Sequence, residues 1–280
     1  MQDGILLIDK PAGLTSRAVD NKIQKIFHTR KVGHLGTLDP FATGLLVVAV
    51  NKGAKCLPYL SDSPKTYIAS CVLGEKTSTG DKDGEVMEKQ PLRAITDIEI
   101  KKALESMLGP SMQIPPMTSA IKVDGQALYK LAHKGQEIER KPRPIEVYSI
   151  KLLFRLGKQV DFIASVSSGT YIRVLAEDFC KKLGTVGHLA NLRRINVGSF
   201  DISKTKPLEE VEESDLLSPL EFIALPKFEL SEAQLALAKN GVKMKLDSDE
   251  AKLCLSYKGE AIAVYRKQED GLYHSERGLF

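Results

Sequence analysis

The most informative stretch of this chain is GHLGTLDPFATG, residues 33–44. Three glycines, one proline and one acid within twelve residues predict a loop of fixed shape rather than a helix or a strand. Pro40 disfavours a helical backbone at the residue before it, Asp39. The unbroken apolar run at residues 45–50 predicts a buried strand that anchors the loop. Asp39 is therefore either a carboxylate held rigidly at a cleft or an acid in a surface turn that bonds its own backbone.

The sequence around this loop predicts strands in hairpins with helices inserted between them. Apolar runs bounded by turn residues indicate strands, and apolar residues at helical spacing after a capping side chain indicate helices. We expect an α+β catalytic domain with a mixed, largely antiparallel sheet. The strands are expected at residues 5–8, 45–50, 67–73, 147–154 and 160–166, and the helices after Thr15 or Ser16, after Thr96, and over residues 172–183.

The end of the chain has the pattern of a separate small module. Residues 206–226 are acidic and punctuated by proline, which predicts a linker. A helix capped by Ser231 and several short strands follow, and together they predict a small β-barrel-like fold. We therefore expect a catalytic domain at residues 1–226 and a second domain at residues 227–280.

Charge is distributed unevenly along the chain, although the net charge is only +4. Four basic residues stand in the acid-free stretch 181–194, whereas acids gather at residues 209–215. This segregation suits a phosphate-binding surface, and it suits solvated basic faces equally well.

The composition also bears on where the protein works. No apolar run approaches the ~20 residues that a membrane-spanning helix needs, and the N-terminus lacks the layout of a signal peptide. The four cysteines form no CxxC pair and stand in apolar stretches. We expect a cytoplasmic protein with reduced, buried cysteines, no membrane contact and no metal site.

Five further segments accompany the loop of residues 33–44. They are DKPAGLTS (9–16), KTY (65–67), PPMTSAIKVDG (115–125), SGTYIR (168–173) and LRR (192–194). In this order they resemble the motifs of the TruB pseudouridine synthase family, in which the Asp of L-D-P is catalytic. One departure is Ser78 within TSTGD, residues 77–81, where family members often carry an acid near the bound RNA.

The resemblance implies a role for each matched residue. Asp39 would be the catalytic carboxylate, Tyr67 would stack on the flipped base, and Arg173 would pair with Asp39. Without the resemblance, Tyr67 is more typical of a core residue and Arg173 of a solvated helix residue. The residues implied to contact substrate or RNA, or to support the active-site loop, are His34, Lys10, Pro11, Tyr171, Leu192, Lys122, Arg193 and Arg194.

The resemblance also implies the partner. Residues 112–146 would form an RNA-gripping insertion, and residues 227–280 a PUA-type RNA-binding domain. The substrate would be the T-loop uridine at position 55 of tRNA, bound through the T-arm by a monomeric enzyme.

The chemistry suits these residue types. The bond from uracil N1 to ribose C1′ breaks, and C5 bonds to C1′ instead, so we expect neither a redox cofactor nor a metal. A carboxylate can act at the sugar, as in glycoside chemistry, and the target base must first leave the RNA stack. Two other functions stay open: a tRNA-binding or tRNA-folding chaperone without catalysis, and a nucleoside hydrolase.

Overall fold

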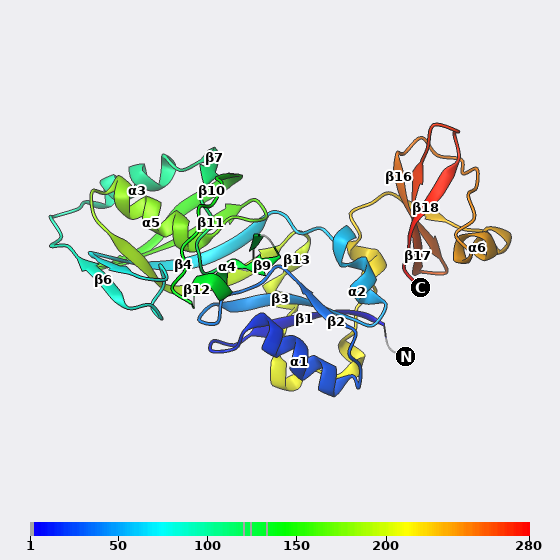
Figure 1. Cartoon of the computed structure of the whole chain (residues 1–280), viewed down its shortest axis with the longest axis horizontal. Helices are drawn as coiled ribbons and strands as arrows, with labels where there is room; N and C mark the ends of the chain where they lie inside the picture. The colour runs from blue at the N-terminus through cyan, green and yellow to red at the C-terminus, as the bar shows by residue number, and fades with distance from the viewer. Residues whose placement is uncertain (1–2, 120, 124, 133) are drawn as a thin grey trace. The chain divides into compact units, whose positions relative to one another are not determined.

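The computed structural model describes residues 3–119, 121–123, 125–132 and 134–280. The chain forms two compact units, each described separately below, and Figure 1 labels their elements. The first unit consists of the segments up to Pro40, Gly44–Asp62 and Ser199–Phe280, and the second of Phe41–Thr43 and Ser63–Gly198. Both contain helices and largely antiparallel strands, which confirms the predicted α+β class.

The first unit opens with three strands and one helix. β1 (Gly4–Lys10) pairs antiparallel with β3 (Thr43–Val50), which also pairs antiparallel with β2 (Val32–Leu35). The apolar face of α1 (Ser16–Ile26) packs on these strands, and it buries Val19 and Ile23 completely. The Thr15 hydroxyl accepts a hydrogen bond from the Ala18 N–H at 3.0 Å, which confirms the predicted helix cap.

The segment predicted as a linker, residues 206–226, packs on the same core. β14 (Lys206–Pro207) runs parallel to β1. Leu208 and Val211 are buried among the residues of α1 and β1. They stand three residues apart and therefore lie on one side of a 3₁₀ turn, while the neighbouring acids stay in solvent. The short helices of this segment are η3 (Leu208–Glu210), η4 (Glu213–Asp215) and η5 (Pro219–Phe222).

The first unit ends in a four-stranded sheet with one helix. The strands follow the order β15-β16-β17-β18; β15 runs parallel to β16, and the other pairs are antiparallel. Tyr265 and Tyr273 fill its core, and the Tyr265 hydroxyl donates to the Val242 carbonyl at 3.1 Å. Among the described residues the sheet is open rather than closed into a barrel. A domain boundary at residue 226 stays a prediction. The elements are β15 (Lys227–Glu229), α6 (Glu232–Lys239), β16 (Lys252–Tyr257), β17 (Glu260–Lys267) and β18 (Tyr273–Gly278).

The second unit is built on an antiparallel sheet with the strand order β12-β4-β11-β10-β7. Helices α3 (Asp97–Glu105) and α5 (Ile172–Lys182) lie side by side against it (Figure 1). The side chain of Thr96 caps α3, as predicted. The strands are β4 (Lys65–Leu73), β7 (Gly109–Gln113), β10 (Arg143–Leu156), β11 (Gln159–Val166) and β12 (Gly187–Val197).

Alternate residues of β4 form its buried face, which includes Tyr67, Ala69 and Cys71. Helix α5 covers this face, since Cys180 of the helix places its Sγ 3.3 Å from the Cys71 Sγ. The hydrogen bond with Cys180, together with burial, holds the pKa of Cys71 well above its usual range, so Cys71 remains a thiol. All four cysteines are free and buried.

The segments between these elements include the predicted RNA-gripping insertion, residues 112–146. It leaves from β7 and returns into β10, and these two strands are paired with Gln113 opposite Arg143. Both ends of the insertion are therefore fixed at one edge of the sheet. Its described elements are β8 (Lys122–Val123), β9 (Gln126–Ala127) and α4 (Leu128–Ala132); a separate hairpin pairs β5 (Glu75–Thr77) with β6 (Val86–Lys89).

Candidate active site

The loop that carries Asp39 is held in place by Lys10, the last residue of β1. The Lys10 side chain is completely buried, and its Nζ donates to the carbonyls of Pro11 at 2.9 Å, Leu14 at 2.6 Å and Pro40 at 3.3 Å. The Gly13 N–H donates to the same Pro40 carbonyl at 2.8 Å. A buried ammonium needs such acceptors to replace its water. The chain immediately after Asp39 is thereby fixed to the segment 10–14.

Ser16 fixes the chain on the other side of Asp39. Its buried Oγ accepts from the Leu38 N–H at 2.9 Å and donates to the Leu38 carbonyl at 3.1 Å. Leu38 itself is buried, whereas Asp39 is half-buried. The two motifs at residues 9–16 and 33–44 therefore meet, and the main chain on both sides of the carboxylate is held by hydrogen bonds.

His34 lies in β2 and is oriented by an acid that the sequence reasoning missed. Its Nδ1 lies 2.9 Å from Oδ2 of Asp20, and its Nε2 lies 3.3 Å from Oγ1 of Thr37. Asp20 is buried in α1 and also faces Arg17, whose Nη1 lies 3.5 Å from the same oxygen. The sequence gives no signal that this single acid on a helix is buried, because its histidine partner belongs to another element.

In the second unit, three predicted residues share one face of the sheet. Tyr67 of β4 lies directly opposite Arg194 of β12, and Leu192 lies opposite Ala69. Opposite residues of an antiparallel pair project to the same face, so Tyr67, Leu192 and Arg194 are neighbours. All three are buried.

The two adjacent arginines of β12 differ in their surroundings. Arg194 is completely buried, whereas Arg193 is half-buried and its Nη1 donates to Oγ1 of Thr43 at 3.4 Å. The RNA contacts expected of both arginines stay predictions, and at Arg194 a direct contact requires the surrounding protein to open. Lys122 lies in β8, and its side chain is outside the described part of the structure.

Tyr171 and Arg173 stand at the start of α5, which covers this face. The Arg173 guanidinium is almost fully buried; its Nη1 donates to the Thr79 carbonyl at 2.8 Å and to the Thr118 hydroxyl. The Asp81 carboxylate lies 3.7 Å from Nη1. No pattern in the sequence points to Thr79 and Thr118 as partners of Arg173, because a main-chain carbonyl or a single hydroxyl has no recognisable motif.

Ser78, the departure from the family pattern, has a local structural role. Its Oγ accepts from the Glu85 N–H at 3.1 Å, and its own N–H donates to the Glu85 carbonyl at 2.9 Å. The hydroxyl therefore closes the turn between β5 and β6.

Each unit contains a pocket. In the second unit, a pocket of about 560 Å³ is lined by Ser78, Thr118, Arg140 and Arg173 among others. Glu177 also lines it; burial raises the pKa of the Glu177 carboxyl, although nearby Lys76 and Lys181 act in the opposite direction.

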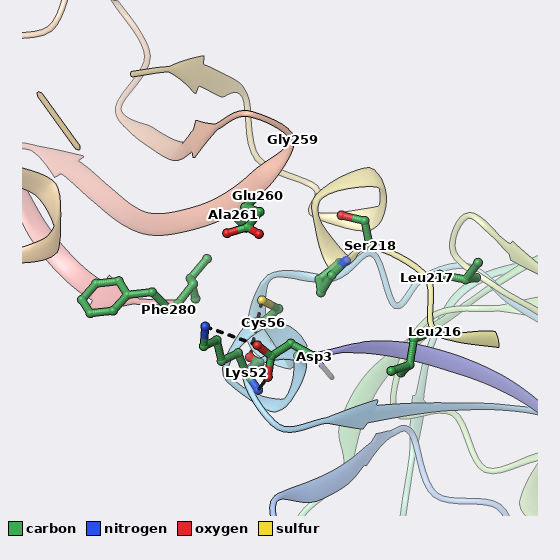
Figure 2. Close-up of a pocket in the computed structure, with 13 residues that line it drawn as sticks. Asp3, Lys52, Cys56, Leu216, Leu217, Ser218, Gly259, Glu260, Ala261 and Phe280 are labelled. Carbon is green, nitrogen blue, oxygen red and sulfur yellow. Dashed lines mark hydrogen bonds and ion pairs between the residues drawn. The ribbon is translucent and has the colours of Figure 1, made fainter. Parts of the chain in front are cut away.

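A pocket in the first unit, of about 350 Å³, is lined by Asp3, by residues of α2 (Gly53–Cys56) and β17, and by the end of the chain, among others. Figure 2 shows Lys52 and Asp3, two of the lining residues, joined by an ion pair, and 3.3 Å separate Nζ from Oδ2. None of the predicted site residues is among the described residues that line this pocket.

The predicted site residues are divided between the two units. Asp39, Lys10, Pro11 and His34 belong to the first unit, and Tyr67, Tyr171, Arg173, Leu192 and Arg194 belong to the second. The pairing of Arg173 with Asp39 stays a prediction. Each helix in the described part of the chain is too short or too polar to span a membrane.

Comparisons with known proteins agree with one another. The sequence model described as TruB family pseudouridylate synthase (N terminal domain) matches residues 24–172. The tRNA pseudouridine synthase B of Oenococcus oeni is 43% identical over 294 residues, which cover 100% of this chain and 98% of that protein. The protein of the same name from Mycobacteroides abscessus is 40% identical over 247 residues, which cover 85% of this chain and 83% of the relative.

Solved structures agree on the fold. A chain from the crystal structure of a Cbf5-Nop10-Gar1 complex superposes with a TM-score of 0.75 at 23% identity, covering 100% of this chain and 85% of that one. A chain from the structure of an H/ACA RNP bound to a substrate RNA gives a TM-score of 0.74 at 22% identity, covering 100% and 86%. The sequence matches define the class of the protein: it is an RNA-modifying isomerase, a pseudouridine synthase. The chain belongs to the TruB family of pseudouridylate synthases.

Replacing Lys10 by Met should lower the free energy of unfolding by about 3 kcal/mol, because buried carbonyls lose a charged hydrogen-bond donor. Met keeps most of the side-chain volume, so packing is largely preserved. Urea unfolding followed by circular dichroism measures the change. Lys52→Met, which removes an exposed lysine from an ion pair, is the matched control and should shift the free energy by less than about 1 kcal/mol. Equal stability of Lys10→Met and the wild type would contradict the role of Lys10 as the support of the loop.

Proposed function

We propose that this enzyme converts the T-loop uridine of tRNA, position 55, to pseudouridine, with Asp39 as the catalytic carboxylate. The relatives named tRNA pseudouridine synthase B, up to full coverage of the chain, support tRNA as the substrate. The observation that carries the proposal is the loop of residues 36–40, where Ser16 and Lys10 hold the main chain on either side of Asp39. A carboxylate on a preorganised loop needs little rearrangement to act at the sugar.

The reaction conserves all atoms of the nucleotide. The N1–C1′ bond breaks, the uracil turns within the site, and C5 bonds to C1′; C5 loses its proton and N1 gains one. Asp39 acts either as a nucleophile at C1′ or as a base toward the ribose, and both roles require an ionised carboxylate. Arg173 pairs with Asp39 in the assembled site and keeps it ionised and oriented.

The flipped uracil is held by the buried face of the second unit. Tyr67 stacks on the base. Leu192, which belongs to the next residue pair on the same face, and Tyr171, the N-cap residue of α5, line the pocket beside it. Burial of Tyr67 and Leu192 supports an apolar site from which the free base does not escape during the turn. His34, oriented by Asp20, occupies the space that the target base leaves in the RNA loop.

The RNA is bound by the insertion of residues 112–146 and by the C-terminal residues 227–280, acting as a PUA-like domain. RNA loops are recognised mainly through shape, phosphates and splayed bases, for which scattered lysines and arginines suffice. The enzyme acts as a monomer in this proposal, without a metal or a cofactor.

An isolated T-arm stem-loop should therefore be a substrate, because recognition is of a folded loop rather than of the whole tRNA. A scrambled loop on the same stem is the matched control and should not be converted. Conversion is followed with a pseudouridine-specific chemical tag and mass spectrometry. Equal rates on the two RNAs would indicate nonspecific action on single strands and would exclude the proposed T-loop specificity.

A further inference from the structure

We propose that Thr118 and Gln113 are positioning residues for Arg173. Both lie in residues 113–118, which form the root of the RNA-gripping insertion. RNA held by the insertion would therefore also fix the orientation of Arg173, the arginine that orients the catalytic carboxylate. This inference rests on the proposed function and extends it. It assigns a second role to the insertion, beyond contact with RNA.

The first observation is the way in which Arg173 is bound. Its side chain is only 3% exposed, so its charge and its N–H donors need partners within the protein. Thr118 accepts hydrogen bonds from both terminal nitrogens of the guanidinium: Nη1 donates to its hydroxyl, and Nη2 donates to its carbonyl at 2.9 Å. Thr79 adds a carbonyl at 2.8 Å from Nη1. Because both Nη atoms are held by one residue of the insertion, a shift of Thr118 would turn the plane of the guanidinium.

The second observation is the contact between Gln113 and Tyr171. The Gln113 side chain is buried; its Oε1 accepts from the Tyr171 N–H at 2.8 Å, and its Nε2 donates to the Tyr171 carbonyl at 3.2 Å. Tyr171 is the N-cap of α5 and has no capping bond from its own side chain. Gln113 therefore fixes the residue from which α5 starts, two positions before Arg173.

The third observation is that the two ends of the insertion are joined to each other by hydrogen bonds. Arg140, near the end of the insertion, donates from Nη1 to the carbonyl of Pro115 at 3.1 Å. Gln113 is also paired with Arg143 where β7 meets β10. Residues 113–118 are thus tied to the outgoing and returning strands, and a movement of the insertion on RNA is transmitted to Thr118.

A positioning role for Thr118 and direct contact of Thr118 with RNA have different measurable consequences. If Thr118 positions Arg173, loss of its hydroxyl slows the chemical step while the affinity for tRNA is kept. If Thr118 instead contacts RNA, affinity falls and the rate at saturating tRNA is kept. The two roles therefore move different measured quantities.

The test compares single-turnover rates at saturating tRNA with dissociation constants measured separately. Thr118→Val keeps the shape and removes the hydroxyl; we expect a rate about 10- to 100-fold lower, since hydrogen bonds to charged groups are of that size, and a dissociation constant within about twofold of wild type. Thr118→Ser restores the hydroxyl and should restore the rate. Thr205→Val is the matched control, because Thr205 is also half-buried and its hydroxyl bonds only a main-chain carbonyl of Ile202 at 2.7 Å among the contacts described for it.

Gln113→Glu provides a second, independent measurement if Thr118→Val folds poorly. It keeps the acceptor for the Tyr171 N–H and loses the donor to the Tyr171 carbonyl, so it should also slow the chemical step without weakening binding. A wild-type rate in Thr118→Val, or a rate that falls only through weaker binding, would overturn this inference. The proposed function would still stand, provided that the wild-type enzyme is active. Wild-type enzyme that makes no pseudouridine in tRNA overturns both.

Discussion

Asp39→Asn is expected to abolish pseudouridine formation while tRNA binding stays within about tenfold of wild type. Asparagine has nearly the same shape, but it is neither a nucleophile toward C1′ nor a base. The loop should keep its geometry, because the hydrogen bonds of Lys10 and Ser16 to the backbone of Pro40 and Leu38 are left in place by this substitution. Single-turnover conversion and filter-binding affinity, measured on the same unmodified tRNA, separate the two effects.

The matched control for this variant is Asp3→Asn. Asp3 is an acid of the same unit, in an ion pair with Lys52 at 3.3 Å, and it is not among the predicted site residues. Its loss should leave the rate of conversion unchanged. Detectable single-turnover conversion by Asp39→Asn would move the catalytic role to another residue.

Tyr67→Phe is expected to bind tRNA nearly as well as wild type and to lose at least ~100-fold in single-turnover rate. A stacking platform needs only the aromatic ring, whereas an acid or base needs the hydroxyl. Reattachment through C5 leaves a proton to be removed, and Asp39 alone is badly placed to serve every proton transfer. The ring of Tyr67 is buried on the sheet face beside Leu192, so phenylalanine fits there without repacking.

Tyr67→Leu is the companion variant and should lose both binding and rate, since base–aromatic stacking is worth ~1–3 kcal/mol per base. Comparable rates for Tyr67→Phe and wild type would leave Tyr67 as a platform only. The proton-transfer group would then have to be another residue, with Asp39 the first candidate.

Much of the fold could be predicted because its signals are local. The unbroken apolar run of β3 and the caps at Thr15 and Thr96 follow from short-range rules, and the structure contains each of them. The segment 206–226 was harder. Its acids and prolines predicted a linker between domains, which stays a prediction, and in the structure Leu208 and Val211 are buried with residues of α1 and β1. Apolar residues without a regular spacing, in an acidic and proline-punctuated stretch, are too weak a pattern to predict that packing.

The candidate site shows a similar limit. The residues of the matched motifs were predicted, but their supports were not. Asp20, Gln113 and Thr118 each contact a residue of another element through one or two hydrogen bonds. The pair Arg193 and Arg194 is different, because successive residues of a strand face opposite sides of the sheet. Once residues 192–194 are assigned to a strand, one arginine must face inward, and in the structure it is Arg194.

The proposed activity is the isomerisation of a uridine in the T-loop of tRNA through Asp39. The most direct measurement incubates unmodified tRNA with wild-type enzyme and, in parallel, with Asp39→Asn, then locates pseudouridine by a specific chemical tag and mass spectrometry. We predict one tagged nucleotide, in the T-loop at position 55, with the wild-type enzyme and none with the variant. Bound tRNA without any tagged nucleotide would instead identify a tRNA-binding or tRNA-folding chaperone, and a tag of equal yield in both samples would show that Asp39 is not the catalytic carboxylate.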